Sequence, residues 1–154
     1  MTERDTGADY GRVVDEQAVI DVAIRYTWAL DFGDWDGLDQ VFLPEATADF
    51  GGPETEVGID AIKARIRRSL EPLDGSQHLC GNHQVSIDGD TATHRCYMHA
   101  QHIRKEVEDG SLYVVAGYYE DRMERTPEGW RIAHRTLTPM WFDGNREVIR
   151  GRRQ

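Results

Sequence analysis

The side chains best suited to acid–base chemistry are an aspartate and a histidine at the ends of two expected elements. Asp31 falls in the last turn of an expected helix, where a carboxylate faces the negative end of the helix dipole at a cost of up to about 1 kcal/mol. Trp28, Leu30 and Phe32 crowd this helix end, so a partly buried acid here needs a partner. The alternative is an exposed acid that solvent tolerates.

His78 opens the first long expected strand, directly after a Gly-Ser-Gln loop, which puts it at the rim of a sheet. A carboxylate paired with this imidazole would hold one tautomer and stabilise the imidazolium, which makes a general base near neutral pH. The alternative is a surface histidine or a hydrogen-bonded core histidine, the commoner use of this residue.

The remaining histidines are sorted by strand alternation. His94 and His102 share one face of their strand, whereas His99 shares the opposite face with Tyr97 and Gln101. The sequence has no His-x-His pair, so a cupin-like metal site is not favoured and no metal is expected.

Arg135 is a candidate cation in the last expected strand. Alternation groups it with Arg131 and Ala133 on one face. If that face looks into a pocket, Arg135 must meet an acid or a substrate oxygen. The alternative is a strand arginine on the surface.

Composition limits the classes of partner. The 18 Lys and Arg against 28 Asp and Glu give a net charge of −10, which repels nucleic acid. No apolar run approaches the ~20 residues of a membrane span, and the polar N-terminus lacks a signal peptide, so we expect a cytoplasmic protein. Cys80 and Cys96 lack the number and spacing of a zinc motif or a disulfide framework and are expected to be buried free thiols.

The length of 154 residues suits a single domain. We expect that domain at 15–143, with a frayed arm at 1–14 and a polar, basic tail at 144–154. Apolar residues at helical spacing predict a helix from 15 to 31–33. They are Val19, Val22, Ala23, Tyr26 and Leu30.

Two further helices are expected before the sheet begins. Asp34 can cap a short second helix that presents Leu38 and Val41-Phe42 and ends at Pro44. A strand at 46–50 leads to a Gly-Gly-Pro breaker, and residues 58–70 predict a third helix. The exposed face of that helix is expected to hold Lys63, Arg65, Arg67 and Arg68 in solvent.

Four long segments predict strands at 78–87, 91–106, 112–125 and 130–142, joined by short turns rich in Gly, Asp and Pro. Such turns make an antiparallel meander. Helices covering one face of a curled sheet give an α+β architecture and leave a pocket on the concave side.

Segments 24–38, 41–47, 58–62 and 129–135 together resemble the SnoaL-like branch of the nuclear transport factor 2-like superfamily, and the resemblance spans 16–142. It implies a cone-shaped, curled antiparallel sheet packed against three N-terminal helices. The same fold hosts isomerases, dehydratases, cyclases, hydrolases and non-catalytic subunits, so it does not fix the function.

Within that superfamily the chain is most similar to scytalone dehydratase, the bile-acid 7α-dehydratase and the hexachlorocyclohexane dehydrochlorinase. Those enzymes eliminate with an Asp–His dyad, which the resemblance assigns to Asp31 and His78. It also assigns catalytic roles to Tyr26 and Arg135. The expected substrate-binding residues are His99, Gln101, Tyr97, Phe50 and Trp28.

The resemblance therefore implies a cofactor-independent lyase acting on a small, apolar, oxygenated molecule. A polyketide cyclase or a ketosteroid-type isomerase could use the same pocket, although the isomerase acid would fall near Phe50. A non-catalytic ligand-binding or subunit module is a further alternative. Outward apolar residues such as Val114 and Trp141 also predict a homo-oligomer, a trimer or a dimer.

Overall fold

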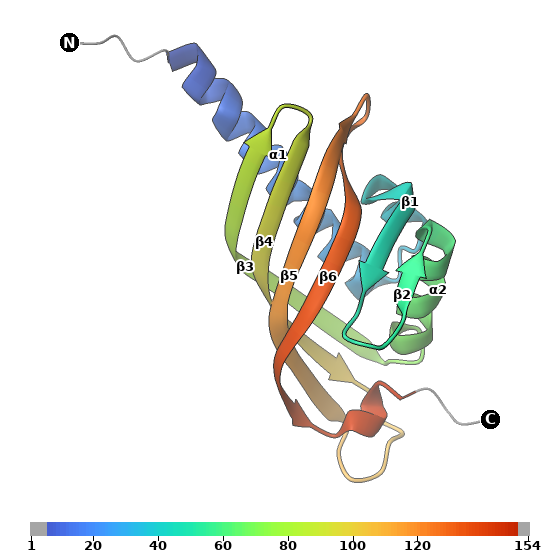
Figure 1. Ribbon diagram of the computed structural model, residues 1–154. Coiled ribbons are helices and arrows are strands. Elements are labelled where there is room, and N and C mark those ends of the chain that lie inside the picture. The colour runs from blue at the N-terminus through green and yellow to red at the C-terminus, as the bar shows by residue number, and fades with distance from the viewer. Residues whose placement is uncertain (1–5, 151–154) are drawn as a thin grey trace.

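The computed structural model describes residues 6–150 and has the predicted α+β class, with a curled six-stranded sheet and two α-helices (Figure 1). The elements in chain order are α1 (Thr6–Phe32), η1 (Asp36–Gln40), β1 (Phe42–Asp49), β2 (Thr55–Val57), α2 (Ile59–Leu70), β3 (Gly75–Asp88), β4 (Thr91–Ile103), β5 (Leu112–Thr126), β6 (Gly129–Gly144) and η2 (Arg146–Val148).

The sheet has the strand order β2-β1-β6-β5-β4-β3. Strands β3 to β6 form the predicted antiparallel meander. Strand β1 instead runs parallel to β6, with Ala48 opposite Arg135. The sheet is therefore mixed, which corrects the expectation that it is antiparallel throughout. The free edge of β6, the last strand of the meander, is occupied by β1 from the N-terminal half of the chain.

Helix α1 begins earlier than the apolar spacing indicated. Of the expected arm at 1–14, residues 1–5 lie outside the described part of the chain, and the helix starts at Thr6. Its first turns project beyond the β3–β4 hairpin (Figure 1). At the other end η2 precedes residues 151–154, which also lie outside the described part. No helix within 6–150 has the length and hydropathy to cross a membrane.

The short second helix is only a 3₁₀ turn, and Pro44 lies inside β1. Asp34 does act at its start, since Oδ1 accepts a hydrogen bond from Gly37 N at 3.0 Å. The β1–β6 ladder is irregular between Phe42 and Thr47. Pro44 has no N–H to donate, so this gap in the ladder accommodates it.

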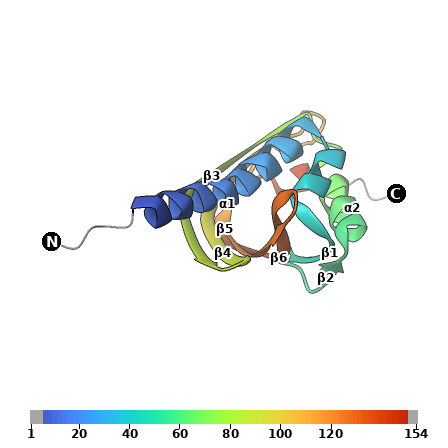
Figure 2. The ribbon, with the colours of Figure 1, turned by 90° about the horizontal axis from the view of Figure 1, so that it is seen from above.

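Both α-helices pack on the concave side of the curled sheet (Figure 2). Val19, Val22 and Tyr26 of α1 and Ile62 of α2 are buried in the shared core. This packing brings α1 against β3, so that the C-terminal end of the helix lies beside the start of the strand.

A close backbone approach between β5 and β6 requires glycine at position 117. A Cβ there would lie 2.3 Å from the Thr138 carbonyl oxygen, whereas a Cβ at Gly81 would meet nothing within 4 Å. We expect Gly117→Ala to lower the free energy of unfolding by about 1–3 kcal/mol through overpacking, as measured by urea denaturation. Gly81→Ala is the matched control, and equal stability of the two variants would contradict the assignment.

Candidate active site

The Asp31 carboxylate contacts His78 through both the ring and the backbone. Asp31 Oδ1 lies 2.6 Å from His78 Nδ1, and Oδ2 accepts a hydrogen bond from the His78 backbone N–H at 2.8 Å. Ser76 Oγ donates to Oδ1 at 3.0 Å. The Asp31 side chain is 14% exposed and the His78 side chain is 6% exposed, so the contact between them is largely withdrawn from water.

These hydrogen bonds fix the ionisation of Asp31 and the tautomer of His78. Burial acts to raise the pKa of Asp31, but the donors from the His78 ring and backbone and from Ser76 outweigh it and lower that pKa below its ordinary value. With the carboxylate ionised, Nδ1–H of His78 is the donor. Nε2 has no hydrogen-bond partner within residues 6–150, which leaves it free as a base.

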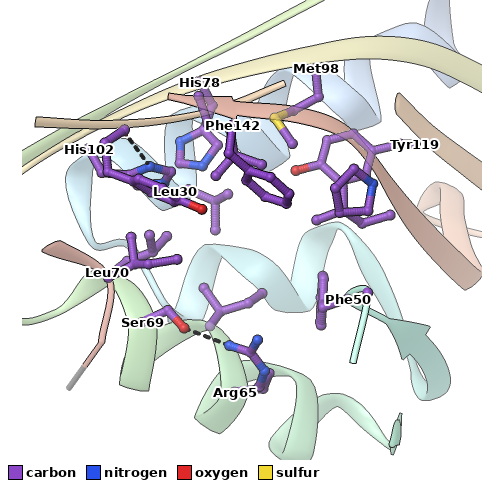
Figure 3. Close-up of a pocket in the computed structure, with 18 of the residues that line it drawn as sticks. Leu30, Phe50, Arg65, Ser69, Leu70, His78, Met98, His102, Tyr119 and Phe142 are labelled. Atoms are coloured by element: carbon purple, nitrogen blue, oxygen red, sulfur yellow. Dashed lines mark hydrogen bonds between the residues drawn. The ribbon is translucent and has the colours of Figure 1, made fainter. Parts of the chain in front are cut away.

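His78 lines a mainly apolar cavity of about 300 Å³ between the sheet and the two helices (Figure 3). This is the low end of the range for small-molecule sites. Its apolar wall includes Leu30, Phe50, Ile66, Leu70, Met98 and Phe142. A ligand in this cavity would be small and would contact mainly apolar side chains.

His102 is a second imidazole in the cavity wall, and its ring lies edge-on to His78 with the ring centroids 5.5 Å apart. Burial, together with the neighbouring His78, lowers the pKa of His102 to about 4. His102 is therefore neutral at pH 7. Its Nδ1–H donates to the Tyr113 carbonyl oxygen at 3.2 Å, which leaves Nε2 as an acceptor.

Arg65 lies on the α2 side of the cavity, opposite His78 and His102 (Figure 3). Its Nη1 donates to Ser69 Oγ at 2.6 Å, and its guanidinium carbon lies 6.0 Å from the centre of the Phe50 ring. The prediction that Arg65 belongs to a solvated helix face is therefore corrected. Its side chain turns toward the groove between α2 and the sheet because Phe50 and Ser69 flank it there.

Of the other predicted site residues, Tyr26 and Phe50 line the cavity. Tyr26 is 2% exposed, and burial raises the pKa of its phenol. Its hydroxyl thus stays protonated at neutral pH and can serve as a hydrogen-bond donor.

Arg135 lies behind the cavity wall and does not line it. It is fully buried and forms a two-pronged ion pair with Asp121, with Nε–Oδ1 at 2.7 Å and Nη2–Oδ2 at 2.8 Å. Its guanidinium carbon also lies 4.2 Å from the ring centres of both Tyr26 and Tyr119. It therefore supports two residues of the wall through cation–π contact.

The predicted grouping of Arg131, Ala133 and Arg135 on one face is wrong. The β5–β6 register shifts so that Met123 pairs with Ile132 and Arg122 with His134. The extra residue is Ala133, and this bulge reverses the alternation that follows it. Arg135 consequently shares the inner face with Ile132.

Four predicted substrate-binding residues lie outside the cavity. His99, Tyr97 and Gln101 occupy odd positions of β4, whose even positions point inward and are buried. Trp28 is 61% exposed on α1, stacked on Phe32. Alternation had grouped the β4 residues correctly, but which of the two groups faces inward depends on the pairing of β4 with its neighbours.

Sequence reasoning missed His102, Arg65 and Asp121 as site residues. His102 lies opposite Ser76 in the β3–β4 register, two residues from His78. The short turn between these strands could not have indicated that pair, because the bulge between Gly81 and Gln84 shifts the register by one residue and a register counted from the turn would place Gln77 opposite His102. Arg65 and Asp121 likewise offered no local signal.

A curled sheet closed by helices over a cavity is the fold of a nuclear transport factor 2-like superfamily protein from Salmonella enterica, which is 18% identical, covers 88% of this chain and 98% of its own, and superimposes with a TM-score of 0.75. The SnoaL-like domain family matches residues 11–136. The chain belongs to the SnoaL-like family. Rv2910c, an uncharacterised protein of Mycobacterium tuberculosis, is 33% identical over 130 residues, which cover 82% of this chain and 86% of that protein.

Solved structures support the same fold. A Novosphingobium aromaticivorans protein, provisionally assigned as an aromatic ring hydroxylase, is 27% identical with a TM-score of 0.79, covering 90% of this chain and 98% of its own. Another protein from that organism, provisionally assigned as a scytalone dehydratase, is 16% identical with a TM-score of 0.80, covering 93% of this chain and 96% of its own. A hexachlorocyclohexane dehydrochlorinase is also 16% identical with a TM-score of 0.78, covering 89% of this chain and 93% of its own. The last two show likeness of fold alone.

Removing the charge of Asp121 should destabilise the protein strongly. Asp121→Asn leaves the buried Arg135 cation without its counter-ion, and we expect a loss of about 3–5 kcal/mol in the free energy of unfolding. Glu124→Gln, at an exposed position of the same strand, is the matched control and should change it by less than about 0.5 kcal/mol. Denaturant titration measures both, and a loss below about 1 kcal/mol for Asp121→Asn would contradict this role.

Proposed function

We propose that this protein catalyses a cofactor-independent elimination, of the dehydratase type, on a small, apolar, oxygenated organic molecule. The observation that carries the proposal is the Asp31–His78 contact at 2.6 Å, which leaves His78 Nε2 without a hydrogen-bond partner among residues 6–150, at the wall of an apolar cavity. Membership of the SnoaL-like family, together with the fold shared with a dehydrochlorinase and a protein provisionally assigned as a scytalone dehydratase, supports small-molecule processing in a cavity of this size.

His78 is the proposed general base. Nε2 removes a proton from a carbon next to a carbonyl group, and the imidazolium that forms is stabilised by the ionised Asp31 at Nδ1. The electron pair of the broken C–H bond forms a C=C bond as the neighbouring C–O bond breaks. The His78 imidazolium returns the abstracted proton to the departing hydroxide, which leaves as water, and the neutral base is regenerated.

Tyr26 is the proposed donor to the oxygen that gains negative charge, because its phenol stays protonated and lines the cavity. The neutral His102 can accept a hydrogen bond from a substrate hydroxyl, and the Arg65 guanidinium can bind a carbonyl or phenolate oxygen on the opposite wall. Arg135 takes the role of a positioning residue, since it acts through the rings of Tyr26 and Tyr119.

Isomerisation or cyclisation in the same pocket would use the same proton abstraction and differ in what the enolate does next. Product mass separates these reactions, because elimination loses water and the other two conserve mass. A non-catalytic ligand-binding role is disfavoured by an ionised carboxylate that orients an otherwise free imidazole nitrogen into the cavity, since ligand binding alone requires no base.

The catalytic pair is tested with racemic one- and two-ring β-hydroxy ketones in D₂O, followed by NMR for exchange of the α-proton and by mass spectrometry for loss of water. Asp31→Asn and His78→Gln should each lower the rate by about two to four powers of ten while the fold, checked by circular dichroism, is kept. His99→Gln, on the outer face of β4, is the control and should keep the wild-type rate. Wild-type turnover in either dyad variant would remove the pair from the mechanism.

We further propose that the protein is cytoplasmic and forms a homo-oligomer through the outer face of the sheet, where Tyr97, Leu79, Met140 and Trp141 are exposed beside one another. Val114, also expected there, is only partly exposed. A contiguous apolar patch of this kind usually marks an interface.

Light scattering after size exclusion measures the mass. We expect a dimer or trimer for the wild type and a monomer for Tyr97→Lys with Trp141→Lys, because the introduced charges would have to be buried in the interface. Thr93→Lys, at an exposed position near the other end of β4, should keep the wild-type mass. A monomeric wild type would refute the proposal.

A further inference from the structure

A second cluster of chemically reactive side chains lies on the inner face of the β3–β4 hairpin, and none of its members lines the cavity. It consists of His83, His94 and Cys96, each offering one ligand atom, and these atoms all lie within 4.8 Å of one another. The closest pair is His83 Nδ1 and His94 Nε2, 3.0 Å apart. The three donors therefore already converge on one point.

A β-bulge produces this convergence. Gly81 pairs with Tyr97 and Gln84 with Arg95, so Asn82 and His83 together lie opposite Cys96 alone. Asn82 has a φ of 54°, in the left-handed region. Simple alternation after Cys80 would turn Asn82 inward, whereas the extra residue turns His83 inward instead, over Cys96 and next to His94.

His94 also has the environment of a metal-binding histidine. Its Nδ1 lies 2.9 Å from Asp121 Oδ2, and Arg135 holds the same carboxylate at 2.7 and 2.8 Å. A carboxylate on one ring nitrogen fixes the tautomer and orients the other nitrogen toward a metal, an arrangement that recurs behind metal-ligating histidines. Here the oriented nitrogen is Nε2, the atom that faces His83.

We propose that His83 Nδ1, His94 Nε2 and Cys96 Sγ form a binding site for a zinc ion. Two imidazoles and one thiolate are a typical donor set for this ion, and three protein ligands leave a fourth tetrahedral position. Binding displaces the proton between the two imidazoles and the proton of the Cys96 thiol. The thiol of Cys80, which hydrogen-bonds with Cys96, adds a second soft donor beside the site.

The site would act as a structural clamp. It would join the edge strand β3 to β4 and, through Asp121 and Arg135, to β5 and β6. This inference does not depend on the proposed elimination, because the three ligands and the cavity residues are separate sets.

The test uses the whole 154-residue chain, stripped with EDTA and titrated with Co²⁺ and then with Zn²⁺ in competition. We expect one equivalent of Co²⁺ with a thiolate-to-cobalt charge-transfer band that Zn²⁺ abolishes, and a higher melting temperature with zinc. His83→Ala should weaken binding at least about tenfold, and Cys96→Ser should remove the band. His99→Ala, a histidine on the outer face of β4, is the control and should bind like the wild type.

The absence of stoichiometric cobalt and zinc binding would overturn the proposal, as would binding that survives both His83→Ala and Cys96→Ser. Circular dichroism of each metal-free variant reports its fold. If Cys96→Ser does not fold, His83→Ala decides the question, because His83 is only half-buried and its loss leaves the core intact.

Discussion

The buried ion pair between Asp121 and Arg135 is the interaction on which the rest of the molecule depends. It ties β5 to β6 where both side chains are buried, at 0% and 1% exposed, and where either charge alone would be costly. Arg135 supports the rings of Tyr26 and Tyr119, which form part of the cavity wall, while Asp121 orients His94 on the other side. One ion pair thus shapes both the cavity and the histidine–cysteine cluster.

The cavity combines an apolar wall with a few oriented polar groups. Ionised Asp31 directs His78, and neutral His102 lies beside it. Within residues 6–150, two cations line the same cavity, Arg65 of α2 on the opposite side and Arg146 of η2. The sheet side therefore supplies proton acceptors, and an oxygen of a bound molecule could meet a guanidinium elsewhere in the wall.

Several local features were predictable from the sequence because each depends on neighbouring residues. The apolar spacing from Val19 to Leu30 predicted α1, and turn residues predicted the meander of β3 to β6. The awkward position of Asp31 at a helix end indicated that it needs a partner. Arg135 was placed on the wrong face because the bulge at Ala133 reverses the alternation of β6, and the end of the second helix was misplaced because the irregular ladder accommodates Pro44 inside β1. Tyr97, His99 and Gln101 were misplaced for another reason, since the local pattern does not say which face of β4 looks inward.

The sequence by itself therefore determined the fold class, the helices α1 and α2 and the meander of β3 to β6, whereas the pairing of Asp31 with His78 was implied by the family resemblance. Tertiary structure decided which face of β4 looks inward, that Arg135 meets Asp121 and not the cavity, and that His83 joins His94 and Cys96. The physical reason is that helix and strand periodicity arises from contacts a few residues apart. Register, bulges and buried charge pairs are instead set by partners many residues away, whose identity only the packed chain reveals.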